Sequence, residues 1–276
     1  MKNLSSKVNL DSIGVNNKDG ISILKVYGST PGVELAKREI YKIVDERTVL
    51  FLSGGSTPKP LYQILAKEKI LKPGTVAMVD ERFGPALHRI SNELSIKKTG
   101  LLGYFASEHI PFFPILHQDL RFHPKGGDTN MRKRRKVAER YNSIVSQLFT
   151  QFPKCISILG LGVDGHTASI APNRPDFKNP LFKRERKNLF VSEFRDPKSM
   201  SKEGSPAPPF GFGERITLTI HALSKMDLLI LLVFGKEKKK ALELLFSKGP
   251  IEEIPARFLK TPQVSKKTLL ITDQKL

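Results

Sequence analysis

The longest unbroken apolar run of the chain, residues 228–234, is far shorter than the roughly 20 residues that cross a bilayer. A continuous apolar run of this length is typical of a strand buried on both faces, as in the centre of a parallel sheet. Further strands are predicted at residues 48–52, 74–80 and 155–159, and helical patterns separate them along the chain. Strands that alternate with helices predict an α/β fold with one doubly wound, mostly parallel sheet and helices on both faces.

Length and composition limit the domain organisation. A chain of 276 residues with 39% hydrophobic content can bury the core of one large α/β domain. Residues 1–20 are polar and lack the apolar segment of a secretory signal, so we expect a loose leader there and a single domain over residues 21–276. Cys155 is the only cysteine, which rules out an internal disulfide and favours a cytoplasmic location.

The formal net charge of +19 has three possible explanations: a nucleic-acid partner, an anionic membrane surface, or a small anionic substrate. The densest basic run, residues 132–136, lies near the start of a predicted helix at 131–149. A nucleic-acid groove favours aromatic side chains between its cations, but here Phe122 and Tyr141 only flank the run. We therefore expect a solvated helix start, no specific nucleic acid, no membrane contact, and a monomer or homodimer. A basic nucleic-acid-binding protein remains the alternative.

The predicted strand at 155–159 leads into a glycine-rich bend that contains Asp164 and His166. The glycines of this bend are Gly160, Gly162 and Gly165. Residues two apart in an extended segment share a face, so the carboxylate can orient the imidazole, and glycines let a ligand approach the backbone. An ordinary strand-to-loop turn with a solvated Asp and His is the alternative interpretation.

The three glycines also match the spacing of the dinucleotide fingerprint, but the context does not. That motif requires a long helix directly after the glycines, and Pro172 and Pro175 interrupt the chain within ten residues. We therefore expect neither a nicotinamide nor a flavin cofactor. The histidines outside the bend show no metal-ligand spacing, so no metal site is predicted either.

A second glycine-containing loop follows the predicted strand at 48–52. It comprises Ser53, Gly54, Gly55, Ser56 and Thr57. Thr57 can cap the next helix with Pro58 in its first position, and the glycine N–H groups can face an anion at the positive helix end. The loop lacks the Lys-Ser/Thr pair of a Walker motif, and a plain capped turn is the alternative.

Charged residues follow two more predicted strands. Asp80, Glu81 and Arg82 end the strand at 74–80, and Lys238 lies just after the run at 228–234. Arg82 can grip a phosphate with two parallel hydrogen bonds, and Lys238 can anchor one as a point charge. A surface ion pair and a helix-surface lysine are the alternatives.

Together these stretches resemble the 6-phosphogluconolactonases, within the wider group that includes glucosamine-6-phosphate deaminases. The resemblance covers residues 21–272 and rests on five motifs in the family's order. These are residues 52–58, residues 79–83 with Ser91 and Asn92, residues 159–169, residues 215–219, and residues 235–238 with Ala241. The resemblance implies a Rossmann-like fold and hydrolysis of 6-phospho-D-glucono-1,5-lactone to 6-phospho-D-gluconate, without metal or cofactor.

The resemblance also implies roles for individual residues. His166 is the expected general base and Asp164 positions it. The expected substrate and phosphate ligands are Ser53, Gly54, Gly55, Ser56, Thr57, Asp80, Arg82, Asn92, Gly165, Arg215 and Lys238. The deaminase branch is the nearer alternative, but it carries a glutamate where this chain has Ala171, and a tyrosine where it has Arg82.

Overall fold

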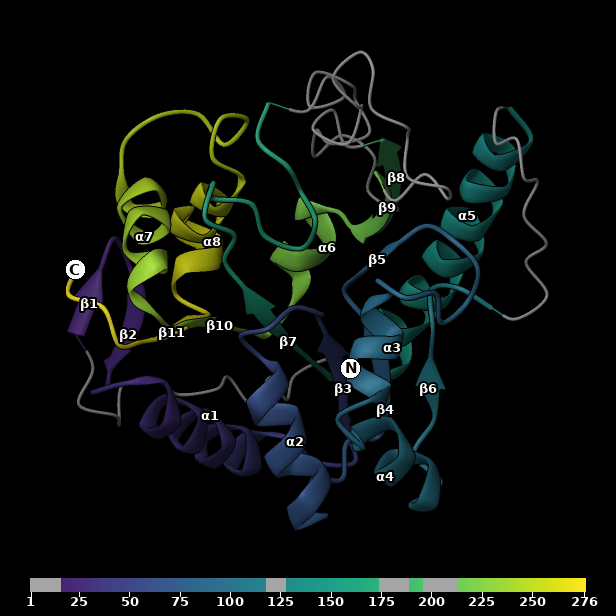
Figure 1. Ribbon diagram of the computed structural model, residues 1–276, viewed down its shortest axis with the longest axis horizontal. Helices are drawn as coiled ribbons and strands as arrows, with labels where there is room; N and C mark the ends of the chain where they lie inside the picture. Colours follow the sequence, from purple (N-terminus) through teal and green to yellow (C-terminus); the bar gives the residue numbers. More distant parts are fainter. Residues whose placement is uncertain (1–15, 118–127, 174–188, 196–212) are drawn as a thin grey trace, which may run out of the picture.

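The computed structural model describes residues 16–117, 128–173, 189–195 and 213–276 (Figure 1). Within them, the larger sheet has eight strands in the order β1-β2-β11-β10-β7-β3-β4-β6. Its strands are β1 (Asn16–Lys18), β2 (Ile21–Lys25), β3 (Thr48–Leu52), β4 (Thr75–Met78), β6 (Phe112–Phe113), β7 (Lys154–Gly160), β10 (Leu228–Val233) and β11 (Thr268–Thr272). All neighbours pair in parallel except β1 with β2. The predicted mostly parallel sheet is confirmed.

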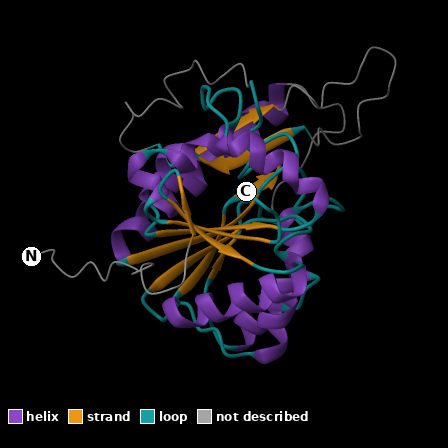
Figure 2. Ribbon diagram, turned by 90° about the vertical axis from the view of Figure 1, so that its left-hand side faces the viewer, coloured by secondary structure: helices purple, strands orange, loops and turns teal. Residues whose placement is uncertain are grey.

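Helices cover both sides of this sheet, as Figure 2 shows. They are α1 (Ser29–Ile43), α2 (Lys59–Glu68), α3 (Asn92–Lys97), α4 (Leu101–Ser107), α5 (Asp128–Gln151), α6 (Ile220–Lys225), α7 (Lys239–Phe246) and α8 (Pro262–Ser265), with 3-10 turns η3 (Lys236–Lys238) and η4 (Pro255–Lys260). Helices α1, α2 and α4 pack side by side on one face. Among the described residues, none of the helices combines the length and apolar character that crossing a membrane requires.

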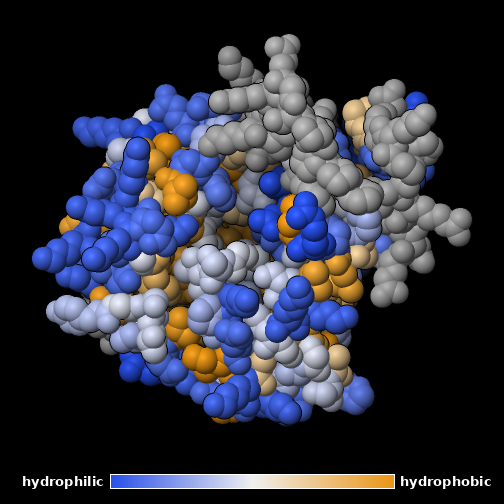
Figure 3. Space-filling view, viewed as in Figure 1, coloured by the Kyte–Doolittle hydropathy of each residue, from blue (hydrophilic) through white to orange (hydrophobic). Residues whose placement is uncertain are grey.

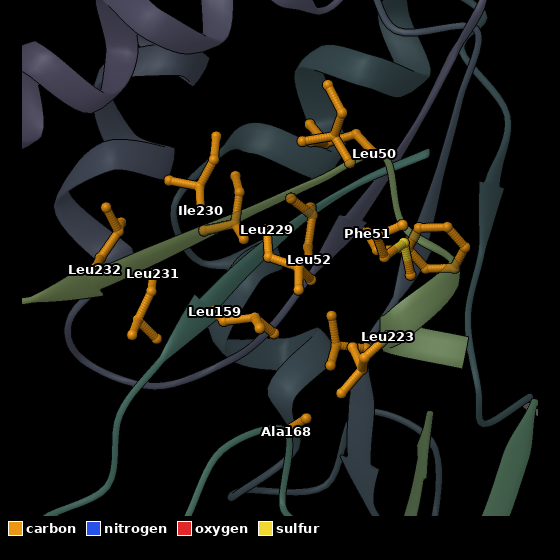
Figure 4. Packing of buried hydrophobic residues seen from close by; sticks show 14 of the residues in the cluster. Leu50, Phe51, Leu52, Leu159, Ala168, Leu223, Leu229, Ile230, Leu231 and Leu232 are labelled. Carbon is orange, nitrogen blue, oxygen red and sulfur yellow. The ribbon is translucent and has the colours of Figure 1, made fainter. Parts of the chain in front are cut away.

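The centre of the sheet is buried on both faces, as the run at 228–234 predicts. Every residue of β10 is buried, and β10 lies between β7 and β11. Leu231 pairs in register with Leu159 on one side and Leu270 on the other. Figure 4 shows Leu229 and Leu231 of β10 near Leu159 of β7. Each fully buried leucine contributes about 2 kcal/mol through removal of apolar surface from water.

A second, antiparallel sheet lies beside the first, in the order β5-β9-β8. Its strands are β5 (Asp80–Arg82), β8 (Val191–Arg195) and β9 (Glu214–Leu218). The chain changes sheet at Val79, whose N–H donates to Leu52 O while its carbonyl accepts from Leu218 N. The sequence pattern predicts strands near these residues, but the prediction of a single sheet is wrong here, because nothing local in a short strand specifies its partner.

The predicted leader at residues 1–20 is only partly described. Residues 16–18 form β1, which pairs with β2 through a tight turn at Asp19 and Gly20. This corrects the expectation that the whole segment is loose, because a short hairpin partner adds a hydrogen-bonded edge strand. Residues 1–15 lie outside the described part of the chain, and the division into leader and single domain stays a prediction.

The basic run at 132–136 is not a uniformly solvated surface. Arg132, Arg135 and Lys136 are exposed, but Arg134 is only 6% exposed. Its guanidinium pairs with Glu193 of β8 through Nε and with Glu214 of β9 through Nη1. Arg134 therefore fastens helix α5 to the smaller sheet, and it is turned away from any ligand on the exposed side of the helix.

We expect Arg134→Met to lower the free energy of unfolding by about 3 kcal/mol, because it leaves two largely buried carboxylates without their partner. Chemical denaturation measures this loss. The matched control is Arg135→Met, which breaks a pair with Glu139 between two exposed side chains and should cost less than about 1 kcal/mol. Equal losses in the two variants would contradict the structural role of Arg134.

Candidate functional site

The site lies where the chain reverses its direction of travel through the larger sheet. After β3 the chain adds β4 and β6 on one side, and after β7 it adds β10 and β11 on the other. Because β3 and β7 are parallel neighbours, the loops at their carboxyl ends leave in opposite directions and open a crevice between them. Ligands of doubly wound sheets bind in such a crevice, so the fold alone points to this edge.

A pocket of about 280 Å³ occupies the crevice. Most of the predicted site residues line it: Ser53, Gly54, Gly55, Ser56, Thr57, Asp80, Arg82, Asn92, His166 and Lys238. They come from the loops after β3, β7 and β10, from β5 and from the start of α3. Three predicted residues, Asp164, Gly165 and Arg215, lie outside the lining.

His166 and Asp164 form a hydrogen-bonded pair at the edge of this pocket. Nδ1 of His166 lies 2.6 Å from Oδ1 of Asp164, and the same oxygen accepts the backbone N–H of His166 at 3.1 Å. Because Nδ1–H donates to the carboxylate, Nε2 of the neutral ring keeps its lone pair. The side chain of His166 is about half exposed, so a water molecule or ligand can reach the ring.

Gly162 permits the imidazole to lie directly over the bend. A methyl group on its Cα would lie 2.0 Å from Nδ1 of His166, closer than any real contact. The turn is held by three hydrogen bonds: Gly162 N to His166 O, Gly165 N to Gly162 O, and Thr167 Oγ1 to Gly160 O. Gly165 therefore shapes the turn from outside the pocket lining, and its predicted contact with substrate stays a prediction.

The loop after β3 leaves the start of α2 without a side-chain cap. The helix begins at Lys59 with Pro58 at the cap position, so the expected capping by Thr57 is wrong. Pro58 has helical backbone angles and occupies the N-cap position itself, so Thr57 lies one residue before that position. Gly54 packs against Asn92, whose Oδ1 would lie 2.0 Å from a methyl group on the glycine. Within the described residues, the backbone N–H groups of residues 54–57 make no hydrogen bond, so they are available for an anion at the positive end of the helix.

Two buried polar atoms of the pocket lining have no hydrogen-bond partner within the described residues. Within the described residues, neither Ser53 Oγ nor Asn92 Oδ1 makes a hydrogen bond, although both side chains are at least 95% buried. Buried polar atoms are rarely left unpaired, because each costs about 1–3 kcal/mol. Ser53 Oγ is therefore well suited to bind a ligand that enters the pocket.

Asp80 is buried, and its carboxylate binds side chains other than that of Arg82. The alternative of a surface ion pair between these two residues is therefore wrong. Oδ2 of Asp80 accepts a hydrogen bond from Nδ2 of Asn92 at 3.0 Å and another from Oγ of Ser169. Arg82 instead donates from Nη1 to Ile90 O at 2.7 Å. Ser169 is not among the predicted site residues, because only the folded chain brings the bend after β7 against β5.

Of the two remaining predicted residues, Lys238 lines the pocket and Arg215 does not. Lys238 donates from Nζ to Leu161 O at 2.7 Å, which holds its ammonium group against the bend after β7. Arg215 pairs in register with Arg82 across β5 and β9, next to the pocket but outside its lining. Within the described residues, no cluster of three or more His, Cys, Asp and Glu side chains could hold a metal ion.

Glu81 is a buried carboxyl group to which sequence analysis gave no role. Alternation along β5 places Asp80 and Arg82 on the pocket side and Glu81 on the opposite side, where it is 1% exposed. Burial raises the pKa of Glu81 to about 7, against the effect of four hydrogen bonds that it accepts. The period of two along a strand is the signal that could have separated its role from those of its neighbours.

Comparison with known proteins identifies the family of the chain. A family model described as glucosamine-6-phosphate isomerases/6-phosphogluconolactonase matches residues 33–270. The chain belongs to this family. It is 30% identical over 196 residues to a 6-phosphogluconolactonase of Caulobacter vibrioides. The aligned residues make up 69% of this chain and 70% of that relative. A 6-phosphogluconolactonase of Thermotoga maritima is 28% identical over 233 residues, 83% of this chain and 87% of the relative.

Solved structures of family members share the fold. The 6-phosphogluconolactonase from Trypanosoma cruzi aligns with a TM-score of 0.66 and 27% identity over 91% of this chain and 93% of its own. The 6-phosphogluconolactonase from Plasmodium vivax aligns with a TM-score of 0.65 and 20% identity over 95% of this chain and 92% of its own. The second likeness concerns the fold alone.

We expect the titration of Glu81 to lower the free energy of unfolding as the pH rises from about 5 to 7. The folded carboxyl has a pKa of about 7 and the unfolded one its ordinary 4.5, so over this range only the folded state holds the proton. The contribution is full below 4.5 and is lost as the pH passes 7. Denaturation of wild type and Glu81→Gln should show a stability difference that falls by about 1 kcal/mol per pH unit. A difference independent of pH would contradict the shifted titration.

Proposed function

We propose that this protein hydrolyses 6-phospho-D-glucono-1,5-lactone to 6-phospho-D-gluconate. One observation carries the proposal: the His166–Asp164 pair opens onto the same pocket as the loop of residues 53–57. A general base and an anion-binding loop are the two parts that hydrolysis of a phosphorylated lactone requires. Membership of the family supports the same reaction.

In the proposed reaction, Nε2 of His166 takes a proton from water as the water oxygen attacks the lactone carbonyl carbon. The carbonyl oxygen becomes a tetrahedral oxyanion, which N–H groups of the glycine loops can stabilise. When the intermediate collapses, the bond from the carbonyl carbon to the ring oxygen breaks, and the imidazolium returns its proton to that oxygen. Asp164 holds the ring in the productive tautomer and stabilises the imidazolium.

The phosphate is far from the reacting carbonyl, and its binding energy positions the ring. The proposed ligands are the loop of residues 53–57, Arg82 and Lys238, which line the pocket together. Ser53 Oγ lacks a partner among the described residues and can donate to a phosphate oxygen. Asp80 acts in this proposal as the group that orients Asn92 and Ser169, and Arg215 as a neighbouring cation.

The high positive charge suits an anionic substrate. Lys236, Lys239 and Lys240 are exposed around Lys238, and Figure 3 shows hydrophilic side chains over the region of α7. A cationic rim raises the local concentration of an anion and speeds its association. This explanation needs no nucleic-acid partner. We further propose a cytoplasmic monomer or homodimer, in keeping with the single buried cysteine, whose thiol pKa burial raises to about 12.

Deaminase chemistry is the less favoured alternative. The position at which the deaminases carry a glutamate is Ala171, which is buried and provides no carboxyl group. Release of ammonia from glucosamine 6-phosphate tests this alternative directly.

Replacing the general base should abolish most of the catalysis. We expect His166→Ala to lower kcat by about 10²–10⁴-fold with a small change in KM, because the variant retains the phosphate ligands. The measurement is the decay of the lactone above its spontaneous rate, followed at several enzyme concentrations. His117→Ala, at a histidine outside the pocket lining, is the control. If wild type does not exceed the spontaneous rate, the proposed function is wrong.

Removing the pocket lysine should weaken substrate binding more than turnover. We expect Lys238→Met to raise KM about tenfold or more, since the phosphate loses a cationic partner before and during reaction alike. Lys240→Met removes an exposed charge of the same helical region and should change KM by less than about threefold at moderate salt. Equal effects of the two substitutions on KM would contradict a direct contact between Lys238 and the phosphate, and would leave Lys238 only a non-specific electrostatic attraction for the substrate.

A further inference from the structure

Glu81 clasps the end of β5 to the start of α3. Its Oε1 accepts from the backbone N–H of Arg82 at 2.7 Å and of Asn92 at 2.8 Å. Its Oε2 accepts from Ser91 Oγ at 2.8 Å and from the backbone N–H of Glu93 at 2.9 Å. The side chain is 1% exposed and lies outside the pocket lining, so it cannot touch a ligand there.

The clasp holds two residues that do line the pocket. Asn92 is fixed at its backbone by Glu81, while its Nδ2 donates to the carbonyl oxygen and the carboxylate of Asp80, each at 3.0 Å. Arg82 is fixed at its backbone N–H by Glu81 and at its guanidinium by Ile90 O. Both ends of the loop between residues 82 and 91 are therefore tied to one carboxylate.

The four donors of the clasp fit the ionised form of Glu81, which predominates above its pKa of about 7. Four donors converge on two oxygens, and each oxygen of a carboxylate can accept two hydrogen bonds. A glutamine of the same shape would turn an NH₂ group toward two of these donors, which places donor against donor in a buried site. The cost is least if the start of α3 moves away, and Asn92 moves with it.

From this arrangement we infer that Glu81 is a positioning residue for substrate binding: it holds Asn92 and Arg82 in place in the pocket. The inference rests on the proposed function for the identity of the substrate. We expect its effect to pass through the phosphate and sugar ligands, because the His166–Asp164 pair belongs to a different loop, the bend after β7.

The test is the effect of Glu81→Gln on KM and kcat separately, with lactone hydrolysis corrected for the spontaneous rate. We expect KM to rise about tenfold or more while kcat changes less than about threefold, because the base is untouched. The product 6-phosphogluconate, titrated calorimetrically, should bind correspondingly more weakly. A merely structural role would reduce the amount of active protein, which lowers apparent kcat and leaves KM unchanged.

Glu39→Gln is the matched control. Glu39 is a buried carboxylate on α1, only 4% exposed and paired with Lys42, and it lies outside the pocket lining. Its replacement should leave KM and product binding as in wild type. A folded Glu81→Gln variant with wild-type KM, or a Glu39→Gln variant with the same rise in KM, would overturn the inference.

A second variant keeps the test decisive if Glu81→Gln does not fold. Ser91→Ala removes one donor of the clasp and the cap of α3, at Leu94 N, and leaves the carboxylate in place. It should raise KM in the same direction by a smaller factor, and an unchanged KM would overturn the inference. If wild type fails to hydrolyse the lactone, the proposed function falls; if wild type is active and the variants keep its KM, only the role of Glu81 falls.

Discussion

The parallel pairing of β3 with β7 is the contact on which the site depends. Its register sets Leu52 beside Ile158, so the loop that begins at Ser53 and the bend that begins at Gly160 start side by side. The chain then leaves the two strands in opposite directions, toward β4 on one side and β10 on the other. An anion-binding loop and a base are thereby brought to one crevice from segments about a hundred residues apart.

The smaller sheet holds the bend after β7 in an unusual backbone conformation. Ala168 and Ser169 have φ angles of 50° and 56°, a region that costs a residue with a side chain roughly 1 kcal/mol or more. Thr217 of β9 donates to Ala168 O, and Asp80 of β5 binds Ser169. These bonds offset the strain, so the sheet that looks peripheral fixes the segment just beyond His166.

The charges of the chain serve different physical ends according to burial. Arg134 is enclosed by two carboxylates and joins α5 to the smaller sheet, whereas Lys236 and its exposed neighbours remain solvated beside the pocket. Glu81 is a buried anion rather than a buried cation. Burial raises its pKa because it penalises the charged form, and the converging hydrogen-bond donors lower its pKa because they favour that form. Net charge alone could not separate these roles, because it contains no information on which groups lose their water.

Local pattern determined the parallel sheet, the buried run of β10, and the Asp164–His166 pair, since two residues that are two apart in a tight glycine-containing turn meet without help from the rest of the chain. The resemblance to the family supplied the roles of the pocket residues. The tertiary structure decided the separate sheet of β5, β9 and β8, the burial of Arg134, the contact of Asp80 with Ser169, and the clasp at Glu81. Each of these joins segments distant in sequence, and long-range pairing depends on which surfaces the whole chain leaves to be covered rather than on the pattern of any one stretch.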